Sequence, residues 1–180
     1  KSAKAKTKKL TYTMKVAKAS VALSGESAVA VGSTTKLTTT KKASSRAKIT
    51  YTSSDDTIAT VSEDGTVKGV KAGKATIKAT LKIGKDTATA TQEVEVKNYV
   101  LSTVAQNKLT ELTATVAGDT KNLKASNFTV KSEATNVVYP VSKVTVDSKD
   151  ASKVTLTLFS ELKDAATYDV TLDGITKTFV

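Results

Sequence analysis

The residues of this sequence that could do chemistry are carboxylates, lysines and tyrosines, because the chain contains neither histidine nor cysteine. Without those two residue types, the usual zinc sites, the Ser-His-Asp triad and Cys-His nucleophiles cannot form. Hydrolysis by two paired carboxylates would need a cleft and a defined separation that small β-domains seldom provide. We therefore predict that the chain is not an enzyme and requires no cofactor for catalysis.

Aspartates near the C-terminus are the candidates for a metal site. Carboxylate and carbonyl oxygens are the ligands that calcium prefers in proteins. No calcium-loop signature accompanies these residues, so acids that lie in solvated turns are the alternative interpretation. Calcium is thus the candidate metal, with candidate ligands Asp147, Asp150, Asp169 and Asp173, and Asp164 nearby.

Positive charge is concentrated in the first half of the chain. The formal net charge is +11, and residues 1–97 carry all of it because residues 98–180 hold nine basic and nine acidic residues. Residues 1–18 include seven lysines and no acid. Such a basic arm favours contact with an anionic polymer, with Lys4, Lys6, Lys8 and Lys9 as the candidates, or it is a solvated linker. The five tyrosines are scattered, so no aromatic platform for nucleic acid is expected.

The composition of the chain is typical of β-structure, so strands must position these residues. The chain contains 32 Thr and 21 Val but one Pro, no Trp and only 4% aromatic residues. Residues branched at Cβ suit pleated surfaces, and apolar and polar residues alternate in short blocks. Strands are predicted in the first half at 10–16, 21–23, 29–31, 35–40, 49–52, 58–61 and 75–81, with a last strand that ends at Val96.

Two local signals sharpen this prediction. Asp64-Gly65 between two β-prone runs predicts a hairpin turn, since glycine tolerates positive φ. Alternation over 75–81 puts Ala75, Ile77, Ala79 and Leu81 on one face.

In the second half, Phe128 is predicted to be core, 160–166 is a candidate helical turn, and 98–100 is expected to continue the preceding strand. Further strands are predicted there at 109–116, 128–131, 137–141, 144–146, 154–159, 168–172 and 175–180.

The first half resembles the bacterial immunoglobulin-like group 2 family. The resemblance rests on Val29-Ala30-Val31-Gly32, Ile49-Thr50-Tyr51-Thr52-Ser53-Ser54-Asp55, Ile58-Ala59-Thr60-Val61, Asp64-Gly65-Thr66-Val67, Gly69-Val70, Ala72-Gly73 and Ala75-Thr76-Ile77, in the family's order. Tyr51 stands where the family usually has Trp. The resemblance implies an antiparallel β-sandwich of the kind found in adhesins, surface-layer proteins and modular wall enzymes, with no fixed ligand.

The second half is similar to the repeated immunoglobulin-like domains of bacillus-type surface-layer (S-layer) proteins. The similarity rests on Asn127-Phe128-Thr129-Val130, on Lys153-Val154-Thr155-Leu156-Thr157-Leu158, on Leu162 and on Tyr168-Asp169-Val170-Thr171-Leu172-Asp173-Gly174. The expected fold is all-β, with two tandem immunoglobulin-like antiparallel sandwiches. The expected domains are 15–97 and 98–180, preceded by a basic linker or leading strand at 1–14.

These resemblances imply a fragment of a structural cell-surface protein that is extracellular and lies in the S-layer on the cell wall. The expected partners are other copies in a surface lattice and an anionic cell-wall polymer, without nucleic acid or a membrane span. An adhesin or glycan-binding module, and a spacer of a wall-associated enzyme, remain as alternatives.

Overall fold

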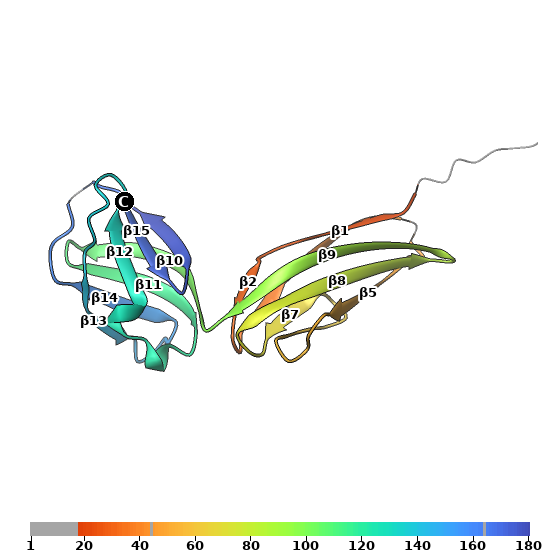
Figure 1. Ribbon diagram of the computed structural model, residues 1–180, viewed down its shortest axis with the longest axis horizontal. Coiled ribbons are helices and arrows are strands. Elements are labelled where there is room, and N and C mark those ends of the chain that lie inside the picture. Colours follow the sequence, from red (N-terminus) through yellow and green to blue (C-terminus); the bar gives the residue numbers. More distant parts are fainter. Residues whose placement is uncertain (1–17, 44, 164) are drawn as a thin grey trace, which may run out of the picture.

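The computed structural model describes residues 18–43, 45–163 and 165–180. The predicted leading strand at 10–16 lies outside them. Within the described part, strands account for nearly all regular structure, and the two short 3₁₀ turns are η1 (Thr120–Asn122) and η2 (Ala125–Asn127). The prediction of an all-β chain is therefore confirmed. Figure 1 shows two sandwiches arranged along the long axis of the molecule.

Three sheets build the first sandwich. They are ordered β1-β4, β2-β9-β8-β5 and β3-β7-β6. All pairings are antiparallel except that of β2 with β9, which is parallel. The strands are β1 (Ser20–Ser24), β2 (Ala28–Ala30), β3 (Thr34–Lys36), β4 (Thr38–Lys42), β5 (Lys48–Ser53), β6 (Ala59–Val61), β7 (Thr66–Gly69), β8 (Gly73–Ile83) and β9 (Asp86–Lys97).

The core of the first sandwich is built from small side chains. The predicted inner face of β8 is buried, because Ala75, Ile77, Ala79 and Leu81 are at most 2% exposed. Tyr51 lies half-buried, and its hydroxyl is 2.6 Å from that of Thr39. A Trp indole at this position would have only its N–H to offer, whereas the phenol can donate or accept. The Tyr51 departure from the family pattern thus gains a polar contact across the sandwich.

The predicted Asp64-Gly65 turn joins β6 to β7. Val61 pairs with Val67 across it, and Gly65 has a φ of +82°. A Cβ at Gly65 would lie 3.1 Å from the Tyr51 ring, so both the backbone angle and the close approach require glycine. The hairpin prediction is confirmed.

Two sheets build the second sandwich. They are ordered β10-β11-β14-β13 and β12-β15-β16, and every pairing is antiparallel. The strands are β10 (Tyr99–Lys108), β11 (Glu111–Gly118), β12 (Phe128–Ser132), β13 (Val141–Val146), β14 (Lys153–Leu158), β15 (Tyr168–Leu172) and β16 (Ile175–Phe179).

Tyr168 anchors the core of the second sandwich. It is 1% exposed, its ring stacks on Phe179 with centroids 5.7 Å apart, and its hydroxyl accepts a hydrogen bond from Lys163 N at 2.6 Å. A tyrosine at the start of a strand whose hydroxyl bonds to the upstream backbone is the tyrosine corner of immunoglobulin-like sandwiches. Phe128, at 6% exposed, is core as predicted.

In the first half, the strand predicted at 35–40 is divided at Leu37 into β3 and β4, which lie in different sheets. Three segments of the second half also differ from the sequence prediction. Residues 98–100 do not continue β9, because a bend at Asn98 separates it from β10, a long strand that was missed. The strand predicted at 137–141 is reduced to one bridge, Val138 with Lys131, before β13 begins. The described residues of 160–166 form a bend, a turn and irregular backbone rather than a helix. Leu162 is nevertheless buried at 2% exposed, so packing rather than helix formation fixes this segment.

Candidate functional site

The connection between the two sandwiches is short and braced by side chains. β9 ends at Lys97 and β10 begins at Tyr99, so a single residue lies between them. Lys97 Nζ donates to the carbonyl oxygen of Asp173 at 3.0 Å, and it lies 3.2 Å from Glu95 Oε1. The Lys97 side chain is only 17% exposed. One partly buried ammonium group therefore joins a strand of the first sandwich to the β15–β16 turn of the second.

The backbone also packs closely at this connection. Tyr99 pairs with Gly118, which has a φ of +117°. A Cβ at Gly118 would lie 2.2 Å from the carbonyl oxygen of Asn98, a distance that side chains do not reach. Asp173 Oδ2 accepts a 3.4 Å hydrogen bond from Tyr99 N. The Asn98 bend is thus held from both sides.

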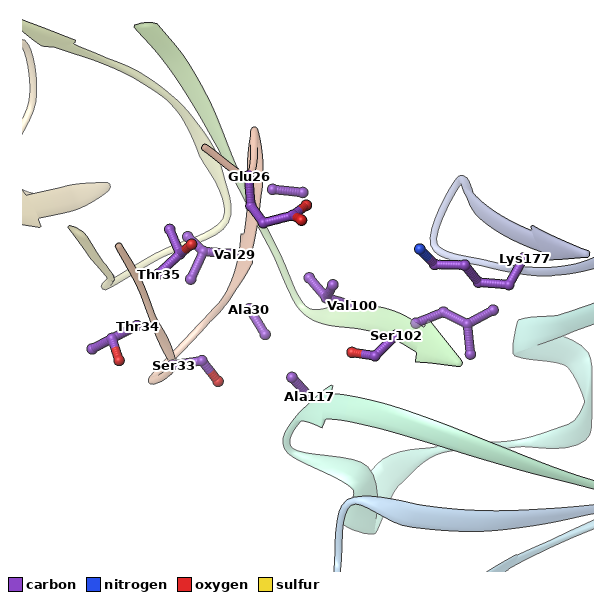
Figure 2. Close-up of a pocket in the computed structure, with 12 residues that line it drawn as sticks. Glu26, Val29, Ala30, Ser33, Thr34, Thr35, Val100, Ser102, Ala117 and Lys177 are labelled. Atoms are coloured by element: carbon purple, nitrogen blue, oxygen red, sulfur yellow. The ribbon is translucent and has the colours of Figure 1, made fainter. Parts of the chain in front are cut away.

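A hollow of about 310 Å³ lies beside this connection (Figure 2). Its floor is formed by small or apolar residues such as Ala30, Val100 and Ala117, and Ser33 and Ser102 add hydroxyl groups. Figure 2 shows the side chains of Glu26 and Lys177 on opposite sides, each pointing toward the other. Residues of both sandwiches line the hollow, which therefore lies at the joint between them.

Cations gather at the opposite end of the first sandwich, which we call the basic end. Ser20 pairs with Lys42, Lys48 pairs with Lys82, and the β8–β9 turn follows directly, so register brings distant segments together. Figure 1 shows the start of β1 and the β8–β9 turn at the same end. All members are exposed, and none forms an ion pair with a described residue. They are Lys18, Lys41, Lys42, Arg46, Lys48, Lys82 and Lys85.

The outer face of the β9-β8-β5 sheet continues from the basic end. Three rows cross these strands, with residues directly opposite one another. We call them the lysine–threonine face, whose rows are Lys48-Lys82-Thr87, Thr50-Thr80-Thr89 and Thr52-Lys78-Thr91. Eight of these nine side chains are exposed and Thr80 is half-buried. Toward the junction the face ends in acids, where Glu93 pairs with Lys74 at 2.8 Å.

The predicted polymer-binding residues Lys4, Lys6, Lys8 and Lys9 lie outside the described residues. Their sequence neighbour Lys18 lies at the basic end. Sequence reasoning located an excess of lysine in the first half but missed the lysine–threonine face. The sequence carried part of the signal for this face, since Lys78 and Lys82 alternate with apolar residues and so lie on the polar side of β8. Their pairing with Lys48 depends on strand register.

The four predicted calcium ligands do not converge. Asp147 and Asp150 share the β13–β14 turn, whereas Asp169 lies near the start of β15 and Asp173 follows its end. Each carboxylate accepts a hydrogen bond from the chain itself; for example, Asp147 Oδ1 accepts from Lys149 N at 2.7 Å, and Asp169 Oδ1 accepts from Thr178 Oγ1 at 2.7 Å. Within the described ranges, no three His, Cys, Asp or Glu residues group as metal ligands would. Calcium binding stays a prediction.

Hydrogen bonds adjust the acidity of two turn aspartates. Ion pairing with Lys36 and hydrogen bonds from Ser62 and Thr66 hold the pKa of Asp64 well below its usual range. The Ser152 hydroxyl and backbone N–H lower the pKa of Asp150. Both carboxylates cap turns, Asp64 exposed and Asp150 half-buried, and hydrogen-bond donors are the first cause of each shift. A structural role explains them.

Comparison with known proteins identifies the first sandwich. Residues 18–92 match the family model of the bacterial Ig-like domain (group 2). The first sandwich has the group 2 bacterial Ig-like fold. This confirms the sequence resemblance on the segments that carried it. No curated protein matches the sequence at a significant level.

Solved structures are similar at low identity. A mutant of intimin from EHEC O157:H7 is 21% identical over 49% of each chain with a TM-score of 0.33, so the match spans about half of that chain. Domains 4 and 5 of the S-layer protein SbsC are 18% identical over 90% of this chain and 96% of that one, with a TM-score of 0.34. Bovine butyrophilin is 11% identical over 91% and 97%, with a TM-score of 0.29. These three proteins differ from one another, yet their structures match this chain at similar TM-scores. The family match alone therefore identifies the first sandwich.

No helix in the described part of the chain is long and apolar enough to cross a membrane.

Proposed function

We propose that this chain is a structural, non-catalytic part of an extracellular bacterial S-layer protein, which assembles into a lattice on the cell wall. The observation that carries the proposal is the braced connection, in which Lys97 of the first sandwich donates to Asp173 of the second. A lattice repeats only if its subunits present their surfaces at fixed relative positions. The bacterial Ig-like match at 18–92 supports a surface location.

The sheet edges supply surfaces for lateral contacts. β5 and β13 each pair on one side only and so present unpaired backbone groups. Threonine and lysine dominate the exposed positions of β5, so contacts through that edge are polar and individually weak. Order in a lattice would then come from many repeated contacts per subunit. We expect the isolated chain to be monomeric or weakly associating at micromolar concentration.

Electron microscopy of the full-length protein that carries these sandwiches tests the proposal. Periodic sheets on cells, or after dialysis of the purified protein, are the expected result. Dispersed monomers under both conditions, with and without calcium, would contradict the lattice and favour the second candidate function. That candidate, a module that binds polymers, is supported by the basic end.

A further inference from the structure

The lysine–threonine face combines features that a binding surface for a linear polyanion requires. It is exposed and continuous, since three neighbouring strands contribute residues in register. Rows lie about 7 Å apart along a strand and neighbouring strands about 4.8 Å apart, so Lys78 and Lys82 stand about 13 Å from one another. The three lysines have no ion-pair partner among the described residues. Their charge is therefore available to a ligand.

We propose that this face binds a linear phosphodiester polymer that lacks aromatic bases. The polymer would run along β8 and continue onto the basic end. Lysine ammonium groups bind phosphate as point charges, and the threonine hydroxyls between them can donate to phosphate oxygens. Arginine, whose planar fork binds carboxylate and phosphate alike through two parallel hydrogen bonds, is absent from the nine positions. The face would therefore hold phosphates through lysine charge and threonine hydroxyls rather than through bidentate pairs.

Two further features fix the direction and the class of the polymer. Toward the junction the nearest lysines, Lys74 and Lys97, are ion-paired with Glu93 and Glu95 and offer no free charge, whereas the basic end continues the face at the other side. None of the nine residues is aromatic, so nucleic acid bases would find no stacking platform. The inference rests on the proposed surface location only because a wall would supply such a polymer. Binding by the purified chain does not depend on a lattice, so the two proposals fail separately.

Titration of the purified chain of residues 1–180 with a glycerol-phosphate polymer tests the inference. The variant K48Q/K78Q/K82Q removes the three lysines of the face, and K121Q/K143Q/K149Q removes the same charge from exposed positions of the second sandwich. We expect the first variant to bind about tenfold more weakly at 0.1 M salt, and to lower the slope of log affinity against log salt by about 2, because three fewer phosphates are neutralised. The second variant should bind as the parent does, and K48R/K78R/K82R should retain most of the affinity.

Further measurements separate the competing explanations. Deletion of residues 1–9, which removes five lysines of the basic arm, measures the contribution of that arm. Equal affinity of the parent and K48Q/K78Q/K82Q would overturn the proposal and leave binding to the arm. Equally tight binding of hyaluronate would overturn the assignment to phosphate. Binding of a single-stranded thymidine oligomer as tight as that of the glycerol-phosphate polymer would identify nucleic acid as the partner instead. Circular dichroism of each variant verifies that its sandwiches are folded.

Discussion

Lys97 and Asp173 are 76 positions apart in sequence, and the hydrogen bond from Lys97 Nζ to the Asp173 carbonyl oxygen, 3.0 Å long, ties the two sandwiches together. The same ammonium group pairs with Glu95, so its charge is balanced within the first sandwich. The donor therefore serves the junction without leaving an uncompensated charge in a partly buried site.

Replacement of Lys97 by Met should loosen the junction while both sandwiches stay folded. Methionine keeps the apolar stem but removes the donor to Asp173. We expect the two sandwiches to tumble more independently in ¹⁵N relaxation measurements, and the free energy of unfolding to fall by about 1 to 3 kcal/mol. Lys143→Met, an exposed change on β13, is the matched control. Identical tumbling of the parent and Lys97→Met would contradict a bracing role.

Separate expression of residues 15–97 and 98–180 should give two folded proteins. Each region has its own cluster of buried residues, one around Ile77 and Val94 and the other around Leu156 and Tyr168. We propose the domain boundary at Lys97–Asn98 on this basis. Circular dichroism and dispersed amide signals in NMR spectra are the measurements. A disordered spectrum from either piece would show that its core depends on the neighbour.

Gly118→Ala should destabilise the second sandwich more than Gly84→Ala destabilises the first. Both glycines have positive φ, which costs a side chain about 1 to 2 kcal/mol. At Gly118 the new Cβ would also meet the Asn98 carbonyl oxygen at 2.2 Å, whereas nothing lies within 4 Å at Gly84. Urea unfolding should therefore show a loss at Gly118 of more than about 2 kcal/mol. Equal losses of unfolding free energy would mean that the backbone at Asn98 can shift without a measurable cost.

Stability should fall as the pH drops below about 4, partly through Asp64 and Asp150. Both carboxyl groups have a lower pKa in the folded chain than in the unfolded one. Such groups stabilise the fold above the unfolded value, about 3.9, and this contribution is lost as the pH falls through the folded pKa. The double variant D64N/D150N should show a weaker dependence of Tm on pH between 4 and 2 in calorimetry. An unchanged pH dependence of Tm in D64N/D150N would contradict this contribution.

Calcium should not raise the Tm of the chain at millimolar concentration. The four predicted ligands do not converge, since only Asp147 and Asp150 share a turn, and their carboxylates serve turns and strand contacts. A ligand that binds only the folded state at a hundred times its Kd would add about 2.7 kcal/mol of stability. Scanning calorimetry with calcium and with chelator would detect such a gain. A gain that D147N/D150N abolishes would locate a calcium site at the β13–β14 turn.

Local patterns predicted the strands and one turn, whereas long-range register determined the surfaces. Alternation gave the buried face of β8, and Asp64-Gly65 gave the β6–β7 hairpin, because both depend on neighbouring residues. The lysine–threonine face needs Lys48 opposite Lys82, a pairing over 34 positions that periodicity does not encode. The contact of Lys97 with Asp173 depends on how two separate cores meet, and a single sequence carries no signal for that.

The parallel pairing of β2 with β9 determines how the first sandwich responds to tension. The two strands lie near opposite ends of the domain sequence, and they are joined by Ala28–Glu95 and Ala30–Lys97 pairs, with Val31 N donating to Lys97 O at 2.9 Å. When the domain is pulled from both ends, force that reaches these two parallel strands makes them slide past each other instead of peeling apart. Their hydrogen bonds are then loaded together, in shear. A cell-surface module with this arrangement would bear force by sharing it among bonds rather than by breaking them one at a time.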